Sequence, residues 1–165
     1  IFFTNRFTAS IVPFLFIIIN YISYKKNIFK SMEREQQKGD FGTVYYAISL
    51  FTLTILSFEI DPLIGASGIL IMGYGDGFAA VMGEKFAKKY ILFNNNKKSL
   101  IGSFTMLILS FIILLILFSI SNTDHVVIKS LLISLIATIV EFLSFKGTDN
   151  LLVPLFTSFL FYINM

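Results

Sequence analysis

The segment 62–82 reads PLIGASGILIMGYGDGFAAVM, an apolar run that carries a single charged residue, Asp76. A helix needs about 20 predominantly apolar residues to cross the hydrocarbon core of a bilayer. A charged side chain in that core costs roughly 2.5–3.5 kcal/mol on insertion scales, so it usually faces the protein interior or a cavity and serves a function. The segment therefore predicts a membrane-spanning helix with a functional aspartate near its end.

The same apolar character continues on both sides of this segment. Hydrophobic residues make up 56% of the 165 residues, charged residues make up 14%, and the mean hydropathy is +0.81. Soluble domains are about 45–50% apolar and about 25% charged. We predict an all-α, polytopic integral membrane protein with about six transmembrane helices, at 7–24, 43–60, 62–82, 100–120, 126–144 and 150–163.

The length of the chain allows only one domain, which we expect to cover residues 1–165. The chain begins with Ile1 rather than methionine. We therefore expect that the sequence lacks the N-terminal part of a longer protein.

Basic residues are concentrated in alternate connections between the predicted helices. Eleven of the thirteen lysines and arginines lie in the connections 25–42, 83–99 and 145–149. The positive-inside rule places such connections in the cytoplasm. With this orientation, Asp76, Glu141 and Asp149 all lie at the cytoplasmic boundary of the membrane.

The residue inventory excludes several kinds of active site. The chain has no cysteine and one histidine, His125, which is expected on the side away from the basic connections. Disulfides, zinc thiolate sites, cysteine nucleophiles and multi-histidine metal sites are therefore excluded, and a Ser-His-Asp triad has almost no material. Any chemistry must use carboxylates, lysines, hydroxyls and backbone groups, which suit Mg²⁺ and phosphate.

The third predicted helix is rich in glycine, which allows two interpretations. Gly73 and Gly77 form a Gly-x-x-x-Gly pattern that is typical of close helix packing in membranes. However, Gly75 and Gly77 also flank Asp76 directly, which favours a broken or unwound helix whose backbone N–H groups can approach a phosphate.

The acidic and basic residues at the predicted cytoplasmic boundary are typical of a nucleotide site. Glu141 lies inside an apolar segment and Asp149 begins another, although Asp149 could also be an ordinary helix cap. Carboxylate oxygens with lysines nearby are what Mg²⁺ and a nucleoside triphosphate require. Lys97 and Lys98 are candidates for phosphate contacts, and as alternatives they are topology signals or contacts for anionic lipid headgroups.

Four short motifs occur in the order found in a known family. They are Gly42-Thr43-Val44-Tyr45-Tyr46, the Gly75–Ala80 stretch GDGFAA with Gly83, the stretch Lys97–Ser99 followed by Gly102-Ser103, and Glu141 followed by DNLLVP at 149–154. Together they resemble the membrane lipid-alcohol kinases, which include phytol, dolichol and yeast-type diacylglycerol kinases and are relatives of phosphatidate cytidylyltransferase. The chain departs from the family pattern in two places. Ile101 stands where the family usually has glutamate, and the family's upstream Arg-Lys-x-x-His-type segment is absent.

The resemblance implies an enzyme that transfers a phosphoryl group from CTP to the hydroxyl of a membrane lipid alcohol such as phytol, a polyprenol or diacylglycerol. It implies Mg²⁺ or another divalent cation as cofactor, a membrane lipid and a nucleoside triphosphate as partners, and no nucleic acid. A homo-oligomer stays an open alternative. The expected catalytic residues are Asp76, Glu141 and Asp149, with Asp76 and Asp149 holding the metal. The expected nucleotide-binding residues are Gly75, Gly77, Lys97, Lys98, Ser99, Gly102, Ser103 and Asn150.

Two other functions are alternatives. One keeps the fold and transfers a cytidylyl group to phosphatidate, forming CDP-diacylglycerol. The other is a small ion-coupled transporter, in which Asp76 and Glu141 would be ion or proton sites within the membrane.

Overall fold

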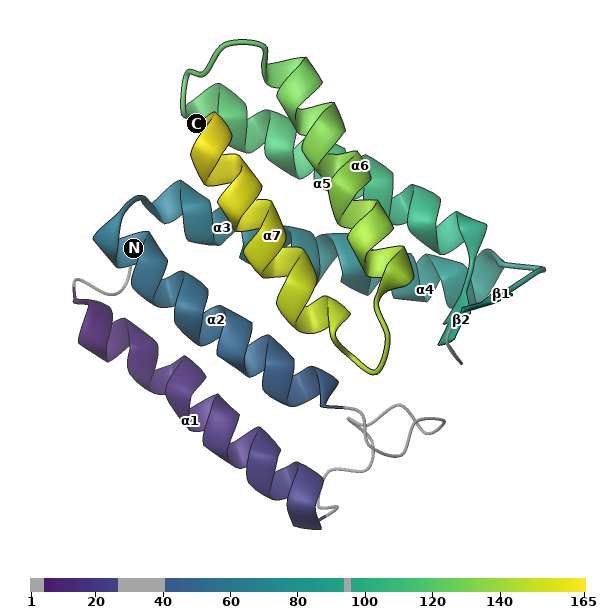
Figure 1. Cartoon of the computed structure of the whole chain (residues 1–165), viewed down its shortest axis with the longest axis horizontal. Helices are drawn as coiled ribbons and strands as arrows, with labels where there is room; N and C mark the ends of the chain where they lie inside the picture. The colour runs from purple at the N-terminus through teal and green to yellow at the C-terminus, as the bar shows by residue number, and fades with distance from the viewer. Residues whose placement is uncertain (1–4, 27–40, 94–95) are drawn as a thin grey trace.

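The computed structural model describes residues 5–26, 41–93 and 96–165, and within them the chain is helical apart from one small hairpin (Figure 1). The elements are α1 (Arg6–Lys26), α2 (Gly42–Glu59), α3 (Pro62–Leu70), a π-helical turn η2 (Ile71–Asp76), α4 (Gly77–Phe86), β1 (Ile91–Phe93), β2 (Asn96–Lys98), α5 (Leu100–Ile120), α6 (Val126–Leu143) and α7 (Asp149–Asn164). Because α3, η2 and α4 follow one another without a gap, they form one long helix. The six predicted helices are confirmed, with ends that differ by a few residues.

Five of these helices are long and apolar enough to cross a membrane, by length and composition. They are Arg6–Lys26, Gly42–Glu59, Pro62–Phe86, Leu100–Ile120 and Val126–Leu143. At most 44% of the apolar window of any of them is buried inside the protein. Their outward surfaces are therefore largely apolar, as expected of helices that face lipid. The last helix, α7, has 16 residues, fewer than about 20 needed to span the hydrocarbon core without further adjustment.

The long helix 62–86 lies at the centre of the fold. Its α3 part packs against α2 and α7, and its η2 and α4 parts pack against α5 (Figure 1). Helix α6 lies between α5 and α7, and α1 packs against α2. The glycine-rich helix therefore contacts both halves of the bundle, and Asp76 lies on the part that faces the later helices.

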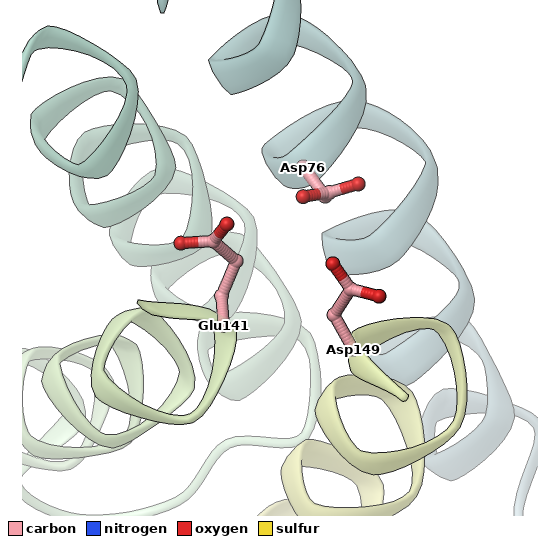
Figure 2. A group of neighbouring side chains, drawn as sticks. All are labelled: Asp76, Glu141 and Asp149. Carbon is pink, nitrogen blue, oxygen red and sulfur yellow. The ribbon is translucent and has the colours of Figure 1, made fainter. Parts of the chain in front are cut away.

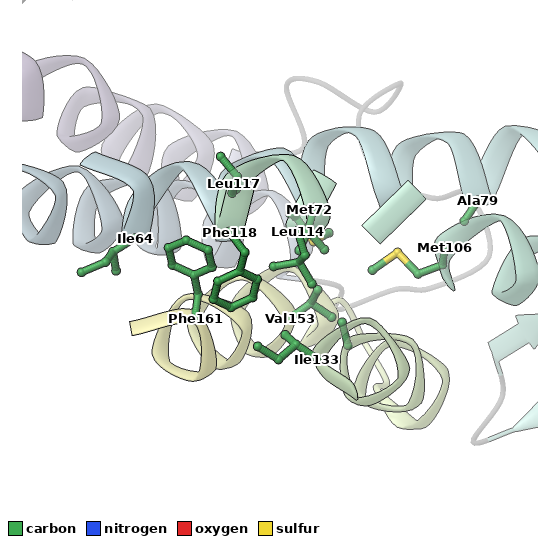
Figure 3. Packing of buried hydrophobic residues seen from close by; sticks show 12 residues of the cluster. Ile64, Met72, Ala79, Met106, Leu114, Leu117, Phe118, Ile133, Val153 and Phe161 are labelled. Carbon is green, nitrogen blue, oxygen red and sulfur yellow. The ribbon is translucent and has the colours of Figure 1, made fainter. Parts of the chain in front are cut away.

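A small apolar core fills the contact between α3, α5, α6 and α7 (Figure 3). The rings of Phe118 and Phe161 are completely buried and lie with their centroids 4.4 Å apart. Phe118 comes from α5 and Phe161 from α7, so this pair joins two helices that are far apart in sequence. Aromatic pairs of this kind add roughly 0.5–1.5 kcal/mol to the gain from burial alone.

The structure corrects the predicted break around Asp76. The helix is not unwound there, because η2 carries the chain from α3 to α4 as a single wide π-helical turn over Ile71–Asp76. Such π-helical turns inside α-helices are rare and are frequently found at functional sites. The glycines therefore permit a change of helical pitch rather than an open loop.

The alternative interpretation, in which Gly73 and Gly77 pack closely against a neighbouring helix, is not seen in the described residues either. A Cβ atom added at Gly73 or at Gly77 would meet nothing within 4 Å. The packed face contains instead Gly75 and Gly83. A Cβ at Gly75 would lie 2.9 Å from Met106 Sδ, and one at Gly83 would lie 2.7 Å from Ser99 Oγ. Close approach of α4 to α5 is the usual consequence of small residues at a membrane helix contact.

The connection between α4 and α5, which the sequence predicts as a loop, contains a hairpin. Strands β1 and β2 pair antiparallel, with Ile91 opposite Lys98 and Leu92 opposite Lys97. Ser99 directly after β2 caps α5, because its Oγ accepts a hydrogen bond from the Gly102 N–H at 3.0 Å. The cap joins the hairpin to α5 in a fixed position, which sets the direction of Lys98.

Candidate functional site

Three acidic side chains from three helices meet at one end of the bundle. Asp76 ends η2, Glu141 lies in the last turn of α6, and Asp149 begins α7. One carboxylate oxygen from each residue lies within 4.8 Å of the others. Figure 2 shows the three carboxylates directed toward the same space. Glu141 and Asp149, which follow Asp76 by at least 65 positions, thus lie beside its side chain. This agrees with the predicted topology, which places all three at the same end of the helices.

A tight turn brings Glu141 and Asp149 to the same place. The turn between α6 and α7 uses the left-handed region at Lys146, with φ of 49°, and at Gly147, with φ of 75°. Glycine reaches that region without steric cost. Thr148 closes the turn, since its Oγ1 donates to the Phe145 carbonyl at 2.8 Å. The reversal of the chain places the end of α6 beside the start of α7.

The three carboxylates differ in their exposure. Glu141 is 7% exposed and Asp149 is 3% exposed, whereas Asp76 is partly exposed at the edge of the group. Asp149 Oδ1 also accepts the backbone N–H of Asn150 at 3.0 Å. Buried charges are retained only when they are paired, hydrogen-bonded or bound to a metal. The two buried carboxylates therefore require positive charge nearby.

Lys98 supplies that charge from the hairpin. Its Nζ forms an ion pair with Glu141 Oε1, donates to the Glu141 backbone carbonyl at 2.9 Å, and lies 3.8 Å from Asp149 Oδ2. The lysine is itself only 9% exposed. The Glu141 carbonyl belongs to the last turn of α6 and also accepts the Ser144 backbone N–H at 3.2 Å. A cation is favourable at this end of a helix, because the helix dipole is negative there. Lys98 thus both neutralises the Glu141 carboxylate and caps the C-terminal end of α6.

Together, the carboxylates of Asp76, Glu141 and Asp149 have the chemistry of a site for a hard divalent cation. Mg²⁺ and Ca²⁺ prefer oxygen ligands, and Mg²⁺ is usually held by one or two carboxylates together with waters and phosphate oxygens. Asp76, Glu141 and Asp149 offer only oxygen ligands and are close enough to share one ion. The donor set therefore fits the magnesium ion that the sequence predicted, and it would not suit a soft metal.

The other predicted site residues lie around this group or on its supporting elements. Lys97 is exposed on the hairpin, whereas Lys98 points inward. Ser99 and Gly102 form the cap of α5 and contact α4, and Ser103 lies in the same first turn. Asn150 follows Asp149 on α7. Gly75 packs against α5, and Gly77 borders open space next to Asp76. Their roles in binding a nucleotide stay predictions.

The ion pair between Lys98 and Glu141 was not found by sequence reasoning. Lys97 and Lys98 are adjacent and chemically alike, so the sequence predicts phosphate contacts for both. The structure separates them, because neighbouring residues on a strand point to opposite sides. A predicted strand at β2 would have indicated that the two lysines point to opposite sides. However, its three residues are too few to show an alternating pattern.

The chain is similar to curated proteins named as phytol kinases. It is 32% identical to "Probable phytol kinase, chloroplastic" of Triticum aestivum over 92% of this chain and 56% of the relative. It is 31% identical to "Phytol kinase" of Synechocystis over 81% of this chain and 58% of the relative. It is 31% identical to "Phytol kinase 1, chloroplastic" of Arabidopsis thaliana over 96% of this chain and 57% of the relative.

These similarities cover nearly all of this chain and only part of each relative. The chain spans a little over half the length of the phytol kinases it matches. No protein-family model matches, and no solved structure matches the fold. The resemblance drawn from the short motifs is confirmed by similarity, over most of this chain, to several curated proteins named as phytol kinases.

Proposed function

We propose that the protein transfers the terminal phosphoryl group of a nucleoside triphosphate, CTP, to the hydroxyl group of a membrane lipid alcohol. The observation that carries the proposal is the meeting of Asp76, Glu141 and Asp149 at one end of a bundle of membrane-spanning helices. The names of the relatives support the choice of phytol or a related prenyl alcohol as acceptor.

In the proposed reaction, the lipid hydroxyl oxygen attacks the γ-phosphorus of CTP. The bond between that phosphorus and the β–γ bridging oxygen breaks, and CDP leaves. Asp76 and Asp149 would hold Mg²⁺, which when bound supplies charge stabilisation on the phosphate oxygens. Glu141 would accept the proton of the attacking hydroxyl, because it lies beside both aspartates.

Exposed lysines at the end of α4 and in the connection that follows it suit the charge of the nucleotide. Lys97 on the hairpin and Lys85 and Lys88 at the end of α4 and beyond it are exposed, so their ammonium groups are accessible to phosphate. Lys98 is less suited to a phosphate contact, since its Nζ is engaged by Glu141. We assign the phosphate contact to Lys97, at a basic edge that the positive-inside rule places in the cytoplasm.

The acceptor is expected to approach from the bilayer. The helix face next to Asp76 is formed by Gly73 and Gly77, beside which an added Cβ would find open space. Tyr74 and Phe78 on the same helix are more than half exposed. A lipid chain lying along these small and aromatic residues would bring its hydroxyl to the three clustered carboxylates at the membrane boundary.

The test is an incubation of the purified protein with γ-labelled CTP or ATP and a panel of phytol, a polyprenol and diacylglycerol. We expect label in a prenyl alcohol, CDP as the other product, and a requirement for a divalent cation. Release of pyrophosphate with formation of a CDP-lipid would identify the cytidylyltransferase instead. Absence of labelled lipid with every donor and acceptor would contradict the proposal.

A further inference from the structure

We propose that the β1–β2 hairpin and the short connection before it bind the surface of an anionic bilayer. Leu92 inserts among the lipids, and Lys88 and Lys89 contact anionic lipid headgroups. This surface lies outside the cluster of Asp76, Glu141 and Asp149, and its binding to lipid does not depend on the reaction proposed for that cluster.

The hairpin lies where two candidate membrane spans reach the membrane boundary (Figure 1). The span Pro62–Phe86 ends four residues before β1, and Ser99 alone separates β2 from the span Leu100–Ile120. Such short connections hold the hairpin close to the ends of both helices. The hairpin is therefore at the level of the lipid headgroups rather than away from the bilayer.

Several apolar side chains of this segment are exposed. Leu92 is 72% exposed, and Phe86, Tyr90 and Ile91 are exposed as well. The Tyr90 hydroxyl donates to the Gly83 carbonyl at 3.3 Å, which holds its ring beside the end of α4. Tyrosine is enriched at membrane interfaces because its ring is apolar and its hydroxyl is polar. A contiguous exposed group of this kind marks a contact with a membrane or with another molecule.

The strand register places an apolar and a basic side chain on the same face of the hairpin. Leu92 pairs with Lys97, and directly opposed residues of an antiparallel pair share a face. Lys97 is exposed, whereas Lys98, the next residue, is buried against Glu141. A lysine stem can lie along apolar surface while its ammonium group reaches water. The outer face of the hairpin thus fits a membrane interface, and Lys97 still reaches a nucleotide there.

The charge of the segment favours an anionic surface over a neutral one. Residues 83–99 contain five lysines and one glutamate. Lys88 and Lys89 are exposed, and neither forms an ion pair with another residue in the part of the chain that the structure describes. Lysines directly beside a membrane span are attracted to anionic lipids. Two such ammonium groups next to exposed apolar side chains therefore indicate a lipid surface as the partner.

The insertion of Leu92 can be measured with a single nitroxide label, because the chain has no cysteine of its own. Leu92→Cys, Ile112→Cys and Asp124→Cys are each labelled in the full chain, in nanodiscs of phosphatidylcholine and phosphatidylglycerol. Ile112 is exposed on the candidate span Leu100–Ile120, and Asp124 is exposed in the connection between α5 and α6. Electron paramagnetic resonance then compares collisions with oxygen, which concentrates in lipid, and with a neutral nickel chelate, which stays in water.

We expect the ratio of oxygen to nickel collisions at position 92 to exceed that at position 124 several-fold and to approach that at position 112. A ratio at position 92 equal to that at position 124 would place Leu92 in water and overturn the inference.

The preference for anionic headgroups needs a second measurement. A fluorophore on Leu92→Cys is quenched by a small fraction of nitroxide-labelled lipid, with either a phosphatidylglycerol or a phosphatidylcholine headgroup. We expect the anionic lipid to quench about twofold more or better. Lys88→Gln/Lys89→Gln should abolish this difference, whereas the matched control Lys25→Gln/Lys26→Gln, at the end of α1, should retain it. Equal quenching by both lipids without these substitutions, or an unchanged difference in Lys88→Gln/Lys89→Gln, would overturn the headgroup contact.

These measurements are independent of the proposed function, because they contain neither nucleotide nor acceptor alcohol. All the substituted side chains are exposed, so we expect every variant to fold. Failure of the lipid contacts would leave the proposed phosphoryl transfer untouched, and loss of transfer activity would not affect the lipid contacts.

Discussion

Two faces of the long helix 62–86 use glycine for opposite purposes. On one face, Gly65, Gly68, Gly75 and Gly83 are in contact with α2, α7 and α5, and an added Cβ would overlap neighbouring atoms. On the other face, Gly73 and Gly77 border open space beside Asp76. The first set holds the helices together, and the second leaves room next to a carboxylate. A glycine motif alone therefore does not distinguish packing from access.

The largest loss of stability is expected from Gly68→Ala on the packed face. The added methyl group would overlap the backbone carbonyl oxygen of Pro154 and the Ser158 hydroxyl, and would lie 2.9 Å from Leu53 Cδ1. A carbonyl in α7 cannot move without shifting that helix, so we expect destabilisation at or above the 1–3 kcal/mol that is typical of overpacking. Thermal unfolding in detergent measures it. A melting temperature equal to that of the wild type would show that this face is not tightly packed.

A smaller loss is expected from Gly83→Ala. Its methyl group would lie 2.7 Å from Ser99 Oγ, which is a side-chain atom that can rotate away. Rotation would cost the cap of α5, worth about 1 kcal/mol for a serine. The same unfolding experiment should place this variant between the wild type and Gly68→Ala. Combination with Ser99→Ala, which removes the cap beforehand, should make the two changes less than additive.

The smallest effect on stability is expected from Gly77→Ala on the open face. Nothing lies within 4 Å of the added Cβ, and alanine favours a helix over glycine by roughly 0.5–1 kcal/mol. We expect unchanged or slightly raised stability. A melting temperature lowered as far as in Gly83→Ala would mean that this face is covered in the folded protein, and the comparison would fail.

The helical architecture follows closely from composition, because hydrocarbon requires long apolar segments with internally paired backbones. The predicted segments 100–120 and 126–144 correspond to α5 and α6 almost residue for residue. The clustering of Asp76, Glu141 and Asp149 was also accessible from sequence. Once the basic connections fix alternate ends of the helices, these residues must lie at the same end.

The parts that sequence could not predict depend on phase and on side-chain direction. A π-helical turn changes the number of residues per turn, so the spacing of Gly73 and Gly77 no longer indicates which face they share. The partner of Lys98 lies 43 residues away and depends on a short hairpin. The pattern of residue types indicates neither the π-helical turn nor the contact between Lys98 and Glu141.

We propose that the cluster of Asp76, Glu141 and Asp149 performs phosphoryl transfer to a lipid alcohol. The most direct measurement compares transfer of labelled phosphate from CTP to phytol by the wild type, Asp76→Asn and the control Glu84→Gln. Glu84 is an exposed carboxylate on the same helix and outside the group. We predict that Asp76→Asn folds normally and loses transfer by several kcal/mol in activation free energy, which is a factor of about 10³ or more, while Glu84→Gln retains it. Undiminished transfer by folded Asp76→Asn would contradict the claim.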